Sequence, residues 1–295
     1  MSVDSEAFKK LKPKAKDEIV KRFNDIESEL NIKIPTTFMQ LVDEEFEANY
    51  PNNLEEFCNW ISCVYDNFIS FSDDLVVQSE KLDSQCIDFI DRLITQLYSK
   101  TNGNGLGNNS WSHFPKIWNL HQIASDMDKI SYVDLSVEFT LNQILTAYVQ
   151  IYELTIHFLV DITQKIAYKQ RREDGESKKF CKLYRKRKMN DMTLSRGELI
   201  NFLNTQDFLN GWNCSIIQDS YIRNKIAHAD YYYESDSKKL IFGNKSYGVE
   251  TVRNIFYSLY GFYCYLLLTF LEEGNFFDLL DKMKEIKESI ENLTS

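Results

Sequence analysis

Apolar residues recur every three or four positions along most of this chain, which is the pattern that amphipathic helices leave in a sequence. One such stripe lies in residues 84–101 and is formed by Cys86, Phe89, Ile90, Leu93 and Leu97. A longer stripe predicts a helix from Ser136 to about Arg172, with apolar positions at Leu141, Leu145, Tyr148, Tyr152, Ile156, Leu159, Ile162 and Ile166. Helices make up most of the predicted secondary structure, and we expect an all-α fold.

Two further helices are expected after residue 190. Ser195 and Glu198 stand at the spacing of a capping box, in which each side chain bonds the other residue's backbone N–H group, and they predict a helix through Phe202. The segment from Cys214 to Ala229 is interpreted as another helix. The C-terminal half is therefore predicted to be a helical bundle.

A small β-hairpin interrupts the helical pattern. Three tyrosines (231–233), the polar sequence ESDSKK and an apolar triplet (240–242) form two short β-prone runs around a turn. A strongly amphipathic helix follows from Val249, and Gly274 would end it. The predicted hairpin thus lies between two helices of the bundle.

Two regions are expected along the chain. Residues 1–130 are interpreted as an N-terminal helical region, for which a regulatory role is one hypothesis, and residues 131–295 as the helical bundle. The Gly-rich sequence TNGNGLGNNS occupies residues 101–110. A phosphate-binding loop would follow a strand and carry a Lys at fixed spacing. This stretch follows a predicted helix instead, so we interpret it as a surface loop.

Composition favours a helical protein of the cytoplasm. Gly and Pro together make up about 5% of the 295 residues, against roughly 12% on average, and few turn-forming residues suit long helices. The six cysteines include no CxxC pair and the N-terminus is charged, so reduced thiols are expected. The most apolar run, residues 259–271, is shorter than the roughly 20 residues that span a bilayer, and no membrane association is predicted.

Charge is distributed unevenly along the chain. The net charge is −10, yet residues 165–188 hold eleven basic and three acidic side chains, so this segment carries +8 and the remainder −18. One interpretation is a solvated helix end and loop. The other is a track that binds the phosphates of RNA. Its candidate RNA-binding residues are Lys178, Lys179, Lys182, Arg185, Lys186, Arg187 and Lys188, with Phe180 and Tyr184 among them either stacking on bases or anchoring the segment.

Familiar metal and nucleotide motifs are absent from the sequence. The four histidines have no zinc-site spacing, and there is no Walker A, EF-hand, GxSxG or kinase signature, so no metal or cofactor is predicted. The sequence from Tyr221 to Asp230, YIRNKIAHAD, holds the one constellation that suggests chemistry. In it Arg223 is followed by Asn224 and, after four intervening residues, by His228.

Arg and His are suited to RNA cleavage because RNA supplies its own nucleophile, the 2′-OH. A histidine can exchange protons near neutral pH, and a guanidinium can bind two phosphate oxygens as negative charge builds up. On an ideal helix, Arg223 and His228 would lie about 140° apart, so a second subunit or a frayed helix end would have to bring them together. The alternative is a purely structural role, in which Arg223 pairs with Asp219 and His228 caps the helix.

This motif, in its helical context, resembles the HEPN superfamily, whose hallmark is R-x4–6-H, often with Asn after the Arg, in an all-helical bundle. The resemblance covers residues 131–295 and implies a homodimer in which two copies of the motif form one composite cleft. It implies that Arg223 and His228 are the catalytic pair and that Asn224 supports them. One subgroup carries a Tyr two residues after the His, where this chain has Asp230.

The function implied is that of a metal-independent endoribonuclease, acting as a toxin or an anti-phage abortive-infection effector. It would cleave RNA such as tRNA or mRNA to a 2′,3′-cyclic phosphate and a 5′-OH end, under the control of an inhibitory or activating partner. The alternative is a non-catalytic HEPN-like module that binds RNA or a nucleotide, or a helical scaffold for a partner protein.

Overall fold

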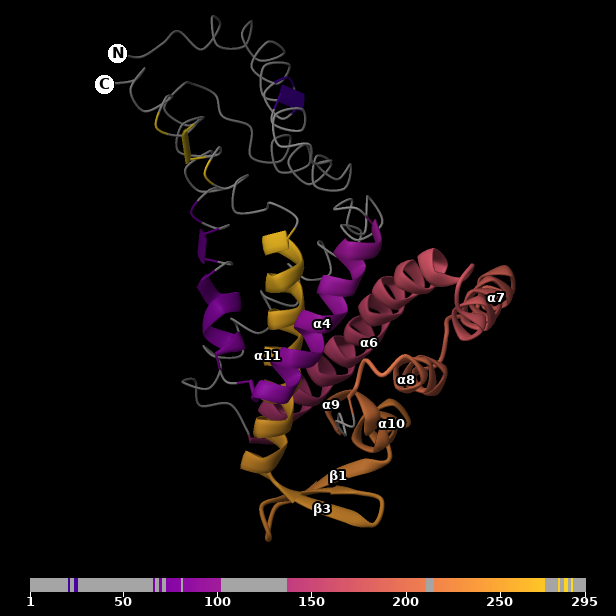
Figure 1. The fold of residues 1–295 in the computed structure, drawn as a ribbon. Coiled ribbons are helices and arrows are strands. Elements are labelled where there is room, and N and C mark those ends of the chain that lie inside the picture. The colour runs from indigo at the N-terminus through magenta and orange to yellow at the C-terminus, as the bar shows by residue number, and fades with distance from the viewer. Residues whose placement is uncertain are drawn as a thin grey trace, which may run out of the picture. The chain divides into compact units, whose positions relative to one another are not determined.

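The computed structural model describes residues 73–80, 82–101, 137–210 and 215–273, with a few isolated positions besides (Figure 1). The named helices in these ranges are α4 (Ser84–Thr101), α6 (Val137–Gln170), α7 (Gly175–Met189), α8 (Arg196–Thr205), α9 (Ser215–Gln218), α10 (Tyr221–Ala227) and α11 (Val249–Glu273). The strands are β1 (Tyr231–Glu234), β2 (Lys239–Phe242) and β3 (Lys245–Gly248). A predominantly helical fold with a small hairpin is thus confirmed.

Two compact units divide the chain. One consists of residues 75–106 and 116–269 and holds nearly all of the elements named above, and the other consists of residues 1–74, 107–115 and 270–295. Helix α4 comes from the predicted N-terminal region, and it packs against α6 within the first unit. The predicted boundary at residue 130 and nearly all of the Gly-rich segment 101–110 lie outside the described residues.

Helices α4, α6 and α11 form the core of the first unit, and they lie side by side in Figure 1. The rings of Phe89 on α4 and Phe262 on α11 stack with their centroids 6.2 Å apart. The hydroxyl of Tyr265 on α11 donates to Asp91 Oδ1 on α4 at 2.9 Å. Each fully buried apolar side chain stabilises the fold by roughly 1.5–3 kcal/mol. Both predicted stripes are buried, at Cys86, Phe89, Ile90, Leu93 and Leu97 on α4 and at Leu141, Leu145, Tyr148, Tyr152, Ile156, Leu159, Ile162 and Ile166 on α6.

Gly261 allows the backbone that precedes α4 to approach α11 closely. A Cβ atom at this position would lie 2.8 Å from the carbonyl oxygen of Gln78. Carbon atoms do not come this close to a backbone oxygen without a shift of one of the chains. The close approach of these two segments therefore requires glycine at position 261.

The helix predicted from Cys214 to Ala229 is wrong in its continuity, because the structure has two helices there. The side chain of Asp219 accepts a hydrogen bond from the Tyr221 N–H group at 2.8 Å, in the geometry of an Asx turn. This bond lies at the break between α9, which ends at Gln218, and α10, which begins at Tyr221. The capping box of Ser195 and Glu198 is confirmed, with both reciprocal bonds present at the start of α8.

The predicted hairpin is confirmed and gains a third strand. β1 pairs antiparallel with β2 and β2 with β3, in the order β1-β2-β3. Gly243, with φ of 57°, stands in the two-residue turn between β2 and β3, where its left-handed backbone is readily accommodated. Leu240 and Phe242 are buried, and the Phe242 ring packs between Tyr231 and Tyr247.

Three helices end in Schellman motifs whose left-handed residue is not glycine. Asp191 after α7, Asp207 after α8 and Ala229 after α10 have φ values of 51°, 56° and 52°. In each case the following N–H group bonds the carbonyl five residues earlier, as in Asp230 N–H to Lys225 O at 2.8 Å. Asp tolerates this conformation better than Ala does. The end of α10 is therefore the most strained of the three.

We expect Gly261→Ala to lower the free energy of unfolding by about 1–3 kcal/mol, because the added methyl group forces the Gln78 backbone away from α11. Thermal or urea unfolding measures this change. Gly175→Ala is the matched control, since nothing lies within 4 Å of its added Cβ, and it should keep or slightly raise stability. Equal effects of the two substitutions would refute the close-approach explanation.

Candidate active site and nucleic-acid interface

Helix α10 carries the R-x4-H motif and packs against α6. In Figure 1 it lies between α8 and the small sheet. It has only seven residues, which is too short to be stable without tertiary support. Ile222 is buried and anchors the helix. The turn between β2 and β3 supports it from another side, because the Tyr221 hydroxyl donates to Phe242 O at 2.6 Å and bonds Asn244 Oδ1 at 2.9 Å.

Arg223 forms an ion pair and a hydrogen bond with Glu153, which lies on α6. Its Nη1 also donates to Oδ1 of Asn224 at 3.0 Å. Arg223 thus pairs with Glu153 rather than with Asp219, whose Oδ1 accepts the Tyr221 N–H group instead. The Arg223 side chain is 30% exposed, so part of the guanidinium still faces solvent. A guanidinium has five N–H donors, and those not used internally can bind a phosphate.

Asn224 contacts Arg223 and the residues at both ends of α10. Its side-chain oxygen accepts from Arg223, and its Nδ2 lies 3.4 Å from the Ser220 hydroxyl. Its backbone carbonyl accepts the N–H of His228 at 3.0 Å. These contacts fit the supporting role that the sequence suggests for Asn224.

His228 is the C-cap residue of α10, and its side chain is exposed. It is followed by Ala229 in the left-handed conformation, which turns the chain towards β1. It follows Arg223 by five positions, which on a helix is about 7.5 Å of rise and about 140° of rotation. Within the described part of the chain no hydrogen bond joins these two side chains. A single copy therefore presents both groups at one end of the bundle without bringing them into contact.

A pocket of about 290 Å³ lies beside the end of α10. Its wall includes Ala229, which follows His228, and the Tyr231 hydroxyl, which lies 3.3 Å from Asn142 Oδ1 on α6. The remaining lining residues are Leu141, Tyr232, Tyr233 and Leu240. Tyr232 is 59% exposed, which is unusual for an aromatic side chain. Polar and aromatic surface thus adjoins the candidate histidine.

One ion pair and one buried hydrogen bond fix the surroundings of the motif. Lys225 bonds Asp230, and this ion pair stabilises the end of α10. Behind Arg223, Tyr152 donates to Ile217 O at 3.3 Å. Burial raises the pKa of Tyr152 to about 12, with Glu153 adding to the rise and Arg196 opposing it. Tyr152 therefore stays protonated at neutral pH and serves as a donor.

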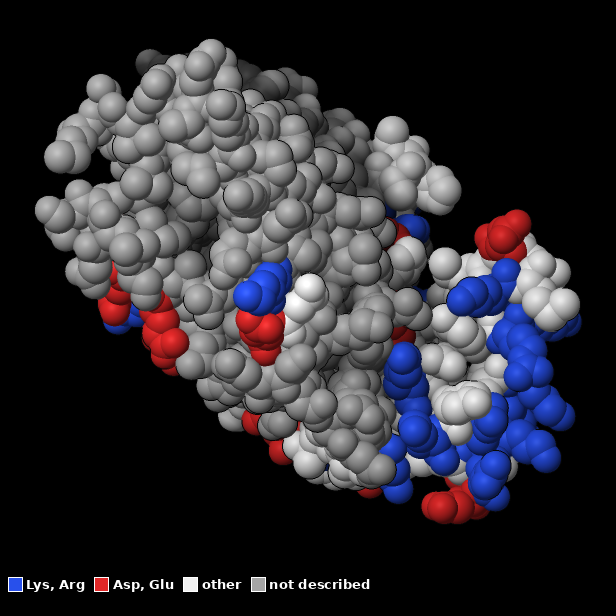
Figure 2. Space-filling view, turned by 90° about the horizontal axis from the view of Figure 1, so that it is seen from above, with Lys and Arg blue, Asp and Glu red and all other residues white. Residues whose placement is uncertain are grey.

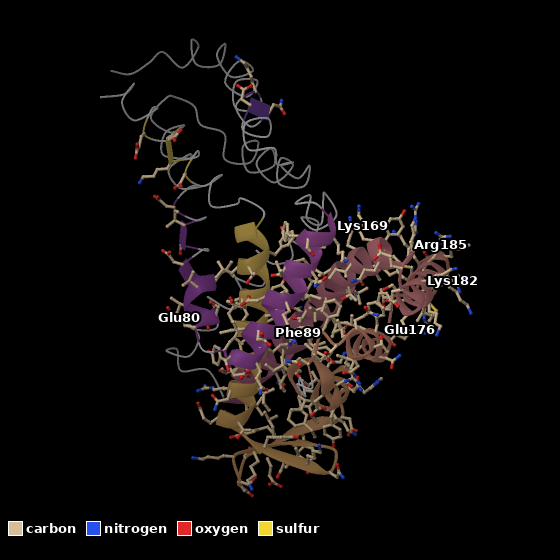
Figure 3. The ribbon with its side chains drawn as sticks, viewed as in Figure 1. Glu80, Phe89, Lys169, Glu176, Lys182 and Arg185 are labelled. Carbon is tan, nitrogen blue, oxygen red and sulfur yellow. The ribbon has the colours of Figure 1, made fainter. Side chains whose placement is uncertain are left out.

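The predicted basic track forms helix α7, which the sequence pattern did not predict as a helix. Figure 2 shows Lys and Arg side chains gathered over the part of the molecule that holds α7. In Figure 3, Lys182 and Arg185 of α7 and Lys169 of α6 point outward. Most of the candidates are exposed, namely Lys178, Lys179, Lys182, Arg185, Lys186 and Lys188. The structure thus places these six cations on an accessible surface.

Two of the candidate cations are engaged in ion pairs. Lys179 bonds Glu176 on the same helix. Arg187 donates to Glu198 of α8 at 2.7 Å, and Glu198 also accepts the Ser195 N–H group at 2.7 Å. Burial alone would raise the pKa of Glu198, but the bonds from Arg187 and Ser195 hold it below its ordinary value. Arg187 therefore links α7 to α8 and has a structural role.

Phe180 and Tyr184 have different surroundings. Phe180 is buried and its ring stacks on Phe202 of α8 at a centroid distance of 4.2 Å. It therefore anchors α7 to the core. Tyr184 is half-buried and lines a groove between α6 and α7.

No family model, no curated protein and no solved structure is significantly similar to the chain. The resemblance to the HEPN superfamily accordingly rests on the residues of the motif and their helical setting. Within the described ranges, no helix has the length and apolar character needed to cross a membrane, and no three His, Cys, Asp or Glu side chains gather as metal ligands would.

Sequence reasoning missed Glu153 and the contacts of Tyr221 and Lys225. Glu153 stands 70 residues before Arg223, and nothing in its neighbourhood distinguishes it from the other carboxylates of an acidic chain. Its position on the same α6 helix as the predicted stripe is the only available signal.

We expect Ala229→Gly to raise the free energy of unfolding by about 1 kcal/mol, since glycine adopts the left-handed backbone without strain. Thermal unfolding monitored by circular dichroism measures the gain. Asp207→Gly, at the same position of another Schellman motif, should gain less because Asp already tolerates this conformation. A destabilising Ala229→Gly would show that the strain argument is wrong.

We expect Arg187→Gln to destabilise the protein by about 1–3 kcal/mol at neutral pH, since it leaves Glu198 without its charged partner. The pKa of Glu198 is lowered in the folded state, so its contribution is present above its ordinary pKa and is lost as the pH falls through the folded value. The difference between variant and wild type should therefore shrink in acid. Arg185→Gln, on the exposed surface, should stay within about 0.5 kcal/mol of wild type.

Proposed function

We propose that this protein is a metal-independent endoribonuclease of the HEPN type. The observation that carries the proposal is the setting of the motif: Glu153 and Asn224 hold the Arg223 guanidinium, while the exposed His228 caps the C-terminal end of the same short helix. The same unit carries the basic surface of α7. One unit thus carries a partly exposed arginine, an exposed histidine and a basic surface, and this combination supports the proposal.

The chemistry is transesterification of the RNA backbone. The ribose 2′-OH loses its proton to a base and attacks the adjacent phosphorus, the bond from phosphorus to the 5′ oxygen breaks, and that oxygen takes up a proton. The products are a 2′,3′-cyclic phosphate and a 5′-OH end. His228 carries one of the two proton transfers, and Arg223 stabilises the negative charge that builds up on the phosphate oxygens. Asn224 orients Arg223.

A homodimer supplies the second half of the site. Because one copy holds Arg223 and His228 apart, two motif helices facing each other would place the His228 of one copy near the Arg223 of the other. The protein would act in the cytoplasm as a toxin or an anti-phage effector on tRNA or mRNA, with a partner that restrains or activates it.

One observation favours a second candidate, a non-catalytic module that binds RNA or a nucleotide. The Glu153 carboxylate neutralises much of the Arg223 charge, so a phosphate must share the guanidinium with it or displace it. A protein that uses Arg223 mainly to hold α10 on α6 would keep the α7 surface and bind RNA without cutting it.

We expect the full-length protein to cut single-stranded RNA in EDTA and to leave DNA and 2′-O-methyl RNA of the same sequence intact, because both lack the nucleophile. His228→Ala should lower the cleavage rate by about 10²- to 10⁴-fold while its thermal unfolding stays unchanged. Gel analysis of the products, with chemical identification of the cyclic phosphate, measures this.

Arg92→Ala is the matched control for Arg223→Ala, since Arg92 is also paired with a carboxylate but lies on α4, away from the motif helix. It should cut RNA normally, whereas Arg223→Ala should not. Cleavage that requires a divalent metal, or that proceeds on 2′-O-methyl RNA, would rule out the proposed mechanism. Binding that persists without any cleavage would favour the second candidate.

A further inference from the structure

A groove of about 320 Å³ lies between the C-terminal end of α6 and one face of α7. Two of its residues, Gln164 and Tyr168, are neighbours on one face of α6, and Arg171 directly follows the end of that helix. The other five are Cys181, Tyr184, Arg185, Lys188 and Met189 on α7. The volume is at the lower end of the range of about 300–1,000 Å³ in which proteins hold small ligands.

Three cations line this groove, Arg171, Arg185 and Lys188. None of its described lining residues is a carboxylate, and no ion pair joins these three cations to a described carboxylate. Their positive charge also acts on the Cys181 thiol in the groove. Burial raises the pKa of this thiol, and Arg171 and Arg185 partly oppose that rise. An anion is the ligand that this charge favours.

Flat and apolar surface accompanies the charge. The guanidinium of Arg171 lies 3.6 Å from the centre of the Tyr168 ring, and Tyr168 is 46% exposed. Met189, at the other side of the groove, is 79% exposed. Aromatic rings and guanidinium planes are the surfaces on which unpaired nucleobases stack, whereas a phosphate alone would need neither.

We propose that this groove binds one nucleotide of a single-stranded RNA, with the base stacked on the Tyr168–Arg171 pair and the adjoining phosphate held by Arg185 and Lys188. The inference rests on the proposed function and adds a base-contacting site to the proposed RNA surface. A strand is favoured over a free nucleotide because the exposed Lys182 and Lys186 continue the cationic surface along α7, beyond the groove.

The test uses the full chain with His228→Ala, so that RNA is bound without being cut. The probes are a fluorescein-labelled oligouridine and an abasic ribose-phosphate strand of the same length, and fluorescence anisotropy gives their affinities. Tyr168→Ala should weaken oligouridine binding by about 5- to 150-fold, the loss of one stacked base. It should leave abasic binding unchanged, and Tyr168→Phe should bind as the parent does.

The cations are tested through salt dependence. Removing Arg185 and Lys188 together should reduce the slope of log affinity against log salt by about 0.7, since the two side chains hold one phosphate and each phosphate neutralised on a single strand contributes about 0.7. Lys179→Ala is the matched control, because Lys179 is exposed on the same helix but is paired with Glu176 and lies outside the groove. The slope of log affinity against log salt should change less in Lys179→Ala than in the variant without Arg185 and Lys188.

Oligouridine affinity that is unchanged by Tyr168→Ala would overturn the proposal, and so would uridine monophosphate that binds as tightly as the strand. Cleavage is assayed separately with His228 in place. If RNA is cut but Tyr168→Ala binds normally, the groove proposal fails alone. If Tyr168-dependent binding occurs without cleavage, the ribonuclease proposal fails and the groove stands.

Discussion

The contact between Arg223 and Glu153 is the interaction on which the candidate site depends. Helix α10 has seven residues, so its position and its very existence come from tertiary contacts rather than from helix propensity. The pair fastens its middle to α6, Asp219 fixes its start, and the Lys225–Asp230 pair fixes its end. The orientation of Arg223 is consequently set by α6, the longest helix of the described core.

The buried side chains and the exposed cations of α7 lie on different faces of the helix. Phe180 and Ser177 are buried towards the bundle, and Arg187 is paired with Glu198 of α8. Of the exposed cations on the other faces, Lys179 is paired with Glu176, and the rest have no described carboxylate partner. The surface that can attract a polyanion is therefore built on a helix whose opposite side is fixed by packing. An acidic chain can in this way carry a local basic surface, because screening in salt confines each charge to about 10 Å.

Much of the fold follows from local signals in the sequence, and the site does not. The stripes of α4 and α6, the capping box at Ser195 and the strands around residues 231–242 are short-range patterns, and the structure contains all of them. Helix α7 lacks an apolar period because so many of its residues are charged, and so its pattern resembled a loop. The break at Asp219 depends on one side-chain bond, and Glu153 and the groove depend on residues that only the tertiary fold brings together.

Helix α6 also fixes how far apart the two proposed RNA contacts lie. Fifteen residues separate Glu153, which holds the motif helix, from Tyr168 in the groove, and at 1.5 Å per residue this is a span of about 22 Å. The rigid helix therefore keeps the motif helix and the groove at a fixed separation. A mononucleotide is too short to contact both sites within one copy, so only a longer RNA strand would bind to both at once.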